Sequence, residues 1–345
     1  MHIPEFERIF VFGDSLMDNG NRRELEKQHS NRKIAEEPYW NGRFTNGYNA
    51  PDYLLLFLEE IYKNLNDKLK IKLINKAVGG ATTRGYGEGK SYVPSIIKQV
   101  KTHIKSNGSF SDRDLIIFGG GGNNFNFGLS KLKLKYLFGI AEDYKKTLDI
   151  LIGSGAKNIL LYNVPDISHT VIFNSHTNFV SKYAFKGLGK VVTFLTKNIN
   201  HKIDRYVLRE KSEINVSIID VFNLMKIMAQ SPEEFEFKPI HHCMIRDFGI
   251  GGNEKVKEKN RKIKTYEDEY SYFFFDFLHP STHAHCIVAK IVLNMLADGM
   301  KHIKYPNMHH HHHVNVDTLN RYIKNVESRL NISIKEISNP ASHTV

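Results

Sequence analysis

Two short segments at opposite ends of the chain hold residues of the types used in nucleophilic acyl transfer. Ser15 closely follows the apolar run Ile9–Phe12, so we expect it on a tight turn at the end of a strand. Far downstream, Asp276 and His279 are separated by two residues and precede a helix-like segment. A serine hydroxyl alone is a poor nucleophile, and it needs a base to take its proton and an acid to orient that base. The sequence therefore predicts a serine hydrolase in which His279 is the base and Asp276 the orienting acid.

Each of these residues also has an ordinary structural interpretation. A serine at the end of a strand is usually a turn or helix-capping residue, and Asp276 could be a loop or capping carboxylate. The presence of all three residue types favours the catalytic interpretation. Pro280 follows His279, and proline is favoured in the first turn of a helix. We therefore expect His279 on the loop at the entrance of that helix, where its ring can point into a cleft.

Four short blocks, widely separated along the chain, together carry a family resemblance. They are Phe12–Gly20, Asn75–Thr82, Gly121–Asn124 and Asp276–Pro280, with weaker echoes at Asn41–Gly47 and Asn163–Asp166. In this order they resemble the GDSL-type esterases and lipases of the SGNH hydrolase superfamily. The resemblance extends roughly from Phe6 to Asp298, and four ordered blocks are far more specific than one motif.

The resemblance also implies which groups stabilise the negatively charged oxygen of the tetrahedral intermediate. In the family these groups are the backbone N–H of the nucleophile, a glycine N–H in the second block and an asparagine side chain in the third. Matched residue by residue, they are Ser15, Gly80 and Asn123, with Gly79 as the alternative for the second donor. The family usually continues the third block with aspartate. This chain has Asn124 there, which puts the hydrogen bonding around Asn123 in doubt.

Apolar runs typical of strands alternate with amphipathic segments typical of helices. This alternation predicts an α/β fold, a three-layer α/β/α flavodoxin-like domain with a parallel sheet. Because such sheets bind ligands at the carboxyl ends of their strands, we expect Ser15, Gly80 and Asn123 at one rim. The predicted strands are Ile9–Phe12, Ile71–Asn75, Asp114–Phe118, Asn158–Asn163 and Asn215–Val221. The predicted helices lie near Ala50–Leu65, Val93–Ile104, Lys131–Ile152 and Gly187–Lys211.

The last third of the chain interrupts this alternation. Glu233–Tyr272 is a long, charged connection, and such connections are usually functional or mobile. We expect one hydrolase domain over residues 6–303 and an appended tail over residues 304–345. The tail contains the run His309–His313 and an amphipathic, helix-like stretch, Val316–Leu330. The apolar side of that stretch either docks on the hydrolase domain or helps the protein to engage a membrane or a partner.

Composition limits the classes of partner. Of the 345 residues, 41% are hydrophobic, which is ample for a large core, and the formal net charge is +11. The charge indicates either a solvated basic surface or peripheral contact with anionic membranes, and no motif for nucleic acid accompanies it. No apolar stretch is long enough for a transmembrane segment, and the first residues lack a signal peptide. A cytoplasmic protein, export without a classical leader and a mature secreted form all stay open.

Several motifs could suggest a cofactor, but each is weak. Arg84–Ser91 resembles a phosphate-binding loop, but Arg84 replaces the first required glycine. His279, His283 and His285 lie close in sequence without the further ligands of a zinc motif. The family resemblance likewise implies no metal. We therefore expect neither a cofactor nor a metal site.

The resemblance implies hydrolysis of a carboxylic ester through an acyl-Ser15 intermediate. Gly42–Phe44 and Ala77–Ala81 are most similar to the larger lipolytic branch, which includes bacterial phospholipases A, lysophospholipases and glycerophospholipid:cholesterol acyltransferases. The expected substrate is therefore a phospholipid or lysophospholipid ester, with acyl transfer to an alcohol as a second outcome. The alternatives are a short-chain or carbohydrate esterase and a non-catalytic binding or effector protein that kept the fold.

Overall fold

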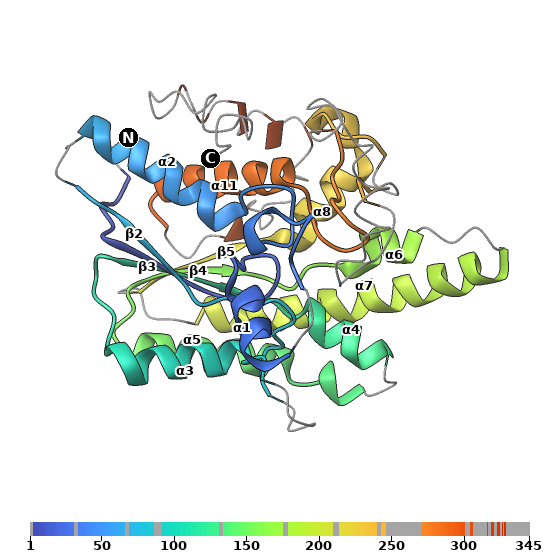
Figure 1. Ribbon diagram of the computed structural model, residues 1–345, viewed down its shortest axis with the longest axis horizontal. Helices are drawn as coiled ribbons and strands as arrows, with labels where there is room; N and C mark the ends of the chain where they lie inside the picture. The colour runs from blue at the N-terminus through green and yellow to red at the C-terminus, as the bar shows by residue number, and fades with distance from the viewer. Residues whose placement is uncertain are drawn as a thin grey trace.

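A parallel sheet of six strands runs through the middle of the part of the chain that the structure describes (Figure 1). In the computed structural model, the described residues are 3–30, 34–65, 69–85, 92–130, 134–174, 179–209, 214–239, 243–245, 271–300, 304–305, 316, 319–320, 323–324, 326 and 328. The strand order β2-β1-β3-β4-β5-β6 is that of a flavodoxin-like sheet extended by one short strand. The strands are β1 (Arg8–Phe12), β2 (Lys72–Asn75), β3 (Asp114–Gly119), β4 (Asn158–Tyr162), β5 (Asn215–Ile219) and β6 (Lys304–Tyr305).

The first five strands lie where the sequence predicts them, within two residues at each end. β3 and β4 are buried along their whole length, as expected for a parallel sheet covered on both faces. The largest difference is at the end of β5, which was expected to extend to Val221. The side chain of Asp220 accepts a hydrogen bond from the Asn223 backbone N–H and caps the following helix. Val221 therefore begins a helix instead of ending a strand.

Helices cover both faces of the sheet, which confirms the predicted three-layer α/β/α domain. Figure 1 shows α2, α8 and α11 on one face and α3, α5 and α7 on the other. The helices are α1 (Asn21–His29), α2 (Ala50–Leu65), α3 (Ile96–Asn107), α4 (Gly122–Ser130), α5 (Ile140–Gly153), α6 (Val171–Asn174), α7 (Phe179–Val207), α8 (Val221–Gln230) and α11 (Thr282–Ala297). Short 3₁₀ turns lie at Trp40–Gly42, Leu134–Tyr136, Ile167–His169 and Pro232–Phe235.

Two helices begin later than the sequence predicts. α3 begins at Ile96 because Ser95 caps it, with the Ser95 hydroxyl accepting a hydrogen bond from the Lys98 N–H. α5 begins at Ile140 because Gly139, with a φ of 90°, adopts a left-handed conformation that ends any helix running through it.

Successive side chains of β1 enter two different cores. Ile9 and Val11 pack into the cluster that contains α2, α8 and α11, whereas Phe10 and Phe12 pack into the cluster that contains α3 and α5. All four side chains are at most 2% exposed. Because β1 is held between two filled layers, the turn that follows it has a fixed position.

The carboxyl ends of β2, β1 and β3 are neighbours at one rim of the sheet. Ser15, Gly80 and Asn123 follow β1, β2 and β3, respectively, so the predicted residues do come from adjacent strand ends. The buried amide of Gln99 on α3 clamps the start of the turn after β1. It accepts a hydrogen bond from the Gly13 N–H and donates one to the Gly13 carbonyl, both at 2.9 Å.

The described parts of the Glu233–Tyr272 connection pack beside the segment that carries Asp276. The Met244 N–H donates to the Phe274 carbonyl at 3.0 Å, and the Ile245 N–H donates to the Phe275 carbonyl at 2.8 Å. Residues 240–242 and 246–270 lie outside the described residues. Among the described helices, none is both long and apolar enough to cross a membrane.

The described tail residues favour docking on the hydrolase domain over a free amphipathic helix. Leu319 and Val326 are 1% and 0% exposed and belong to the same core cluster as α2 and α11. Asn320 donates a hydrogen bond to Glu234 at 3.2 Å. β6 pairs with β5 just past the predicted boundary at residue 303. That boundary stays a prediction, and His309–His313 lies outside the described residues.

Leu319→Ala is expected to lower the free energy of unfolding by about 2–5 kcal/mol, because it truncates a fully buried leucine. Lys324→Ala, which changes an exposed residue of the same stretch, should change that free energy by less than about 0.5 kcal/mol. Urea unfolding followed by circular dichroism measures both. Small and equal changes in the two variants would contradict docking.

Candidate active site

Ser15 lies on a tight turn directly after β1. The Asp14 carbonyl accepts hydrogen bonds from the Met17 and Asp18 N–H groups at 3.2 and 3.1 Å, and the Asp14 carboxylate accepts one from the Leu16 N–H at 3.1 Å. Burial raises the pKa of Asp14 to about 6, although the Leu16 hydrogen bond and the charge of His279 lower it. The turn thus points the Ser15 side chain away from the strand.

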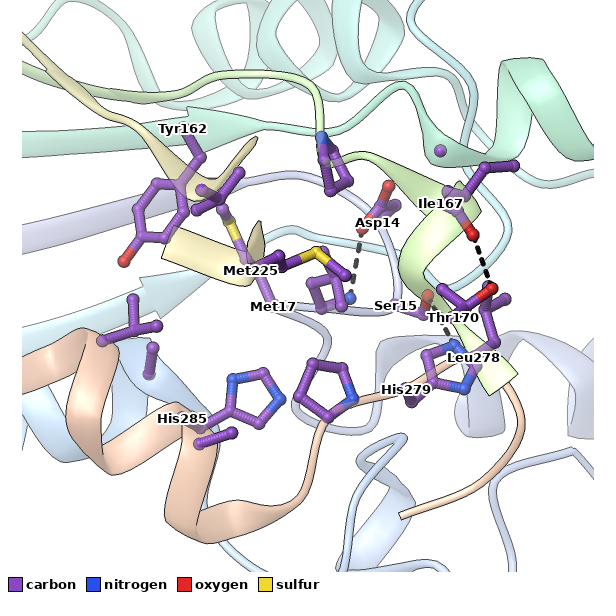
Figure 2. Close-up of a pocket in the computed structure, with 18 of the residues that line it drawn as sticks. Asp14, Ser15, Met17, Tyr162, Ile167, Thr170, Met225, Leu278, His279 and His285 are labelled. Carbon is purple, nitrogen blue, oxygen red and sulfur yellow. Dashed lines mark hydrogen bonds between the residues drawn. The ribbon is translucent and has the colours of Figure 1, made fainter. Parts of the chain in front are cut away.

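Ser15, His279 and Asp276 form a continuous chain of hydrogen bonds. The Ser15 Oγ lies 2.9 Å from His279 Nε2, and His279 Nδ1 lies 2.7 Å from Asp276 Oδ2. Figure 2 shows the Ser15 hydroxyl directed at the His279 ring. His279 precedes α11, as the sequence predicts. That helix starts at Thr282 with Ser281 as its N-cap, so Pro280 lies outside it.

The Asp276 carboxylate is buried and accepts four hydrogen bonds. Oδ1 accepts from the Leu278 and His279 backbone N–H groups, both at 2.7 Å, so the spacing of two residues closes a local turn. Oδ2 accepts from the His279 ring and from the hydroxyl of Tyr39, also at 2.7 Å. Burial raises the pKa of Asp276, but the charge of His279 and these hydrogen bonds outweigh it and leave that pKa below its usual value. The carboxylate is therefore ionised at neutral pH.

Tyr39 is a site residue that sequence reasoning missed. Burial and the neighbouring Asp276 charge raise the pKa of Tyr39, so its hydroxyl stays protonated and can donate. Its ring packs against Phe275 and Phe44, with centroids 5.3 and 5.9 Å apart. Phe44 in turn lies 5.1 Å from the His279 ring. Phe44 belongs to a weak family echo, but no spacing rule points to Tyr39.

The backbone N–H groups of Ser15 and Gly80, both at the rim, have no hydrogen-bond partner among the described residues. The Gly79 N–H, by contrast, donates to the Asp18 carboxylate at 2.7 Å. Of the two glycines, only Gly80 therefore has an N–H that is available among the described residues. Arg22 donates to the Gly79 carbonyl at 2.6 Å. In a trans peptide the carbonyl and the next N–H point in opposite directions, so Arg22 turns the Gly80 N–H to the other side.

Asn123 and Asn124 begin α4, one partly exposed and one fully buried. The Asn123 amide donates to the Ala81 carbonyl at 3.1 Å, which ties it to the second block. Asn124 accepts from the Thr83 N–H at 3.1 Å and donates to the Tyr136 carbonyl at 2.9 Å. A carboxylate could not make the second of these bonds. The second amide N–H of Asn124 donates to the Thr83 hydroxyl at 3.1 Å, so Asn124 links the third block to the residue just after the second block.

An apolar cavity opens beside Ser15 and His279 (Figure 2). Its space between atoms is about 900 Å³, which includes the opening to solvent. α8 contributes Leu224, Met225 and Met228, and α11 contributes Ala284 and Val288. The arrangement can hold an apolar chain next to a hydrogen-bonded serine.

The described residues contain no group of three or more His, Cys, Asp or Glu side chains that could hold a metal ion. His283 points to the Phe235 carbonyl at 3.3 Å, and burial lowers its pKa to about 4. Most of the segment that resembles a phosphate-binding loop, residues 86–91, lies outside the described residues. Arg84 pairs with Asp143 at 3.4 Å.

A flavodoxin-like sheet with a hydrogen-bonded Ser–His–Asp chain at its carboxyl rim defines a hydrolase of the SGNH type. The chain matches the GDSL-like lipase/acylhydrolase family over residues 9–292, and it belongs to that family.

Individual relatives are more distant. The phosphatidylcholine-sterol acyltransferase of Aeromonas hydrophila is 30% identical over 178 residues, which are 48% of this chain and 46% of that protein. The thermolabile hemolysin of Vibrio parahaemolyticus is 24% identical over 305 residues, which are 85% of this chain and 64% of that protein. The chain thus covers less than two thirds of either relative. Among solved structures, the chain aligns with an acetylxylan esterase from Geobacillus stearothermophilus at 14% identity and a TM-score of 0.39. The alignment covers 88% of this chain and 100% of the esterase chain.

Tyr39→Phe is expected to lower kcat by about ten- to a hundredfold with little change in KM. The variant keeps the ring packing but removes one hydrogen bond to a buried charge, and such a bond contributes about 1.5–3 kcal/mol. Steady-state kinetics on a short p-nitrophenyl ester give both constants. The control is Tyr53→Phe, which loses a buried hydroxyl bonded to Thr282 at 2.8 Å. An unchanged kcat in Tyr39→Phe would mean that the backbone alone orients Asp276.

Proposed function

We propose that this protein hydrolyses lipid esters through an acyl-serine intermediate. Ser15 is the nucleophile, His279 the general base and Asp276 the residue that orients the imidazole. The observation that carries this proposal is the chain of hydrogen bonds from Ser15 through His279 to Asp276, at 2.9 and 2.7 Å.

The first half of the reaction forms the acyl-enzyme. His279 Nε2 takes the proton of Ser15 as its Oγ attacks the ester carbonyl carbon. Asp276 keeps the Nδ1–H directed at its own Oδ2 and stabilises the imidazolium. His279 then gives the proton to the leaving alcohol oxygen as the carbon–oxygen bond of the ester breaks.

The tetrahedral intermediate needs donors that already point at its negatively charged oxygen. The N–H groups of Ser15 and Gly80 are proposed for this role because neither has another partner among the described residues. Asn123 is the third donor. One N–H of its side-chain amide donates to the Ala81 carbonyl, and the second N–H of that amide is proposed to donate to the oxyanion.

In the second half of the reaction an acceptor attacks the acyl-serine carbonyl while His279 takes its proton, and the bond to the Ser15 Oγ then breaks as His279 returns the proton to that oxygen. Water gives a free fatty acid. An alcohol gives a new ester, and the name of the Aeromonas relative, a phosphatidylcholine-sterol acyltransferase, supports testing sterols as acceptors. Both outcomes use the same residues.

The apolar cavity supports a lipid acyl chain over an acetyl group or a sugar. Between its reacting end and its far end, the side chains of α8 and α11 that line it are almost all aliphatic or thioether. Moving each methylene of an acyl chain from water into such a lining is favourable by about 0.8 kcal/mol. A phospholipid or lysophospholipid ester is therefore the proposed substrate.

Ser15→Ala is expected to lower ester hydrolysis by about three to six orders of magnitude, because the triad loses its nucleophile. It should also abolish labelling by a fluorophosphonate probe without changing the circular dichroism. The control is Ser111→Ala. Ser111 precedes β3 and so lies at the amino ends of the strands, opposite the rim that carries Ser15. Activity within about tenfold of the wild type would rule out Ser15 as the nucleophile.

The outer face of α7 supports peripheral contact with an anionic membrane. Val191 and Phe194 are 52% and 65% exposed and are three residues apart, so they share one face of the helix. Lys190 and Lys197 are exposed beside them, and the only acidic residue of 186–205, Asp204, is buried. Exposed aromatic and aliphatic side chains among lysines are typical of helices that lie in a lipid interface.

α7 is connected to the wall of the cavity from its inner side. Thr193, which lies on another side of the helix from Val191 and Phe194, bonds to Ser168 at 2.8 Å and to the Asp166 carboxylate at 2.7 Å. Ser168 belongs to the 3₁₀ turn whose first residue, Ile167, lines the cavity. A membrane on the exposed face would therefore lie one helix away from this part of the cavity wall.

Phe194→Ser is expected to weaken binding to phosphatidylglycerol-containing vesicles by about tenfold, because burial of a phenylalanine side chain contributes about 1.5–3 kcal/mol. Hydrolysis of a soluble p-nitrophenyl ester should not change. Leu208→Ser serves as the control. Leu208 is 57% exposed, but it lies directly after the C-terminal end of α7, away from Phe194. Equal loss of vesicle binding in both variants would contradict a specific membrane-facing surface, as would vesicle binding that neither variant affects.

A further inference from the structure

Two polar side chains lie at the end of the cavity opposite the triad. Figure 2 shows Tyr162 and His285 on one side of the cavity and Ser15 and His279 on the other, with Met225 between them. Tyr162 is the last residue of β4, and His285 lies in the first turns of α11. The reaction outlined above uses neither residue.

Both side chains are buried and have no hydrogen-bond partner among the described residues. Tyr162 is 7% and His285 is 6% exposed, and both line the cavity. The polar atoms of Tyr162 and His285 are not among the described side-chain atoms that are fully inaccessible and have no hydrogen bond. Some surface of the Tyr162 hydroxyl and the His285 ring nitrogens is therefore open, and the cavity is the open space that both residues line.

The other polar groups of the lining differ from these two. Thr170 is satisfied internally, because its hydroxyl donates to the Ile167 carbonyl at 2.6 Å. Asn126 is partly exposed. Asp14, Ser15, Asn123 and His279 form the reacting end. The remaining cavity is apolar, so Tyr162 and His285 make a separate polar end beyond an apolar section.

The charge state of this end limits what it can bind. Burial raises the pKa of Tyr162 and lowers that of His285 to about 3, so both are neutral near pH 7. A carboxylate or an ammonium group would be buried there without a counter-ion, which is strongly unfavourable. A neutral hydroxyl suits both residues, because it donates to one and accepts from the other.

We propose that this polar end binds a hydroxyl group on the acyl chain, so that the enzyme prefers hydroxyacyl esters to unsubstituted acyl esters of the same length. The inference rests on the proposed function, which places the acyl chain in the cavity. An unsubstituted chain that reaches this end displaces water and leaves two buried polar groups without hydrogen-bond partners, which is unfavourable. A hydroxyl at the matching carbon satisfies both.

The test is a series of p-nitrophenyl esters of one chain length, in which a single hydroxyl moves along the chain. In wild-type enzyme, kcat/KM should rise about tenfold or more above the unsubstituted ester at one position. Tyr162→Phe, which removes only the hydroxyl, and His285→Leu should each reduce that ratio several-fold. Met225→Leu changes the same cavity without touching a polar group, and it should leave the ratio unchanged.

The outcomes separate this inference from the proposed function. Labelling of Ser15 by a fluorophosphonate reports the nucleophile without needing an acyl chain. If Ser15 is labelled but no hydroxyl position raises kcat/KM, the polar end holds only water and the inference is wrong. A preference that survives both Tyr162→Phe and His285→Leu would also overturn it. If Ser15 is not labelled, the proposed function itself fails.

Discussion

The polar contacts around the Gly80 end of the site depend on one buried carboxylate, that of Asp18 in the turn after β1. It accepts hydrogen bonds from the backbone N–H groups of Gly20, Asn21 and Arg22, at 2.7–3.0 Å. It also accepts the Gly79 N–H from the strand-end loop of β2. Asp18 thus starts α1, aligns Arg22 with the Gly79 carbonyl and leaves the Gly80 N–H free. Burial raises the pKa of Asp18 to about 6, whereas its four backbone hydrogen bonds lower it.

The parts of the fold that depend on local pattern could be predicted from the sequence. β1 to β5 are apolar runs of a buried parallel sheet, and α2 matches its predicted bounds at both ends. The geometry of Asp276 and His279 also follows from their spacing, since two intervening residues close a turn on the carboxylate. Ser15, Gly80 and Asn123 come together because the strands that precede them, β1, β2 and β3, are neighbours in the sheet.

What the sequence could not predict are contacts between parts of the chain with no shared pattern. Tyr39 and Asp276 are 237 residues apart, and nothing around Tyr39 marks it as a partner of a carboxylate. From the sequence, Arg22 is one of several charged residues on a surface helix, and only the structure shows its contact with the Gly79 carbonyl. The amphipathic pattern places the starts of α3 and α5 too early in the sequence. The structure has them later, because the single capping residues Ser95 and Gly139 outweigh that pattern. Asn124 shows the reverse, since the family comparison puts its local hydrogen bonding in doubt and the structure gives its amide partners on both sides.

The sequence separation of Ser15 and His279, 264 residues, has a consequence for biosynthesis. A chain emerging from the ribosome carries its serine first and its imidazole among the last residues of the hydrolase region. Since serine without a base is a poor nucleophile, every unfinished chain is chemically inert. A chain that is still being synthesised therefore lacks part of the Ser15–His279–Asp276 arrangement. These hydrogen bonds can form only after the segment that carries Asp276 and His279, directly before α11, has packed beside the turn after β1.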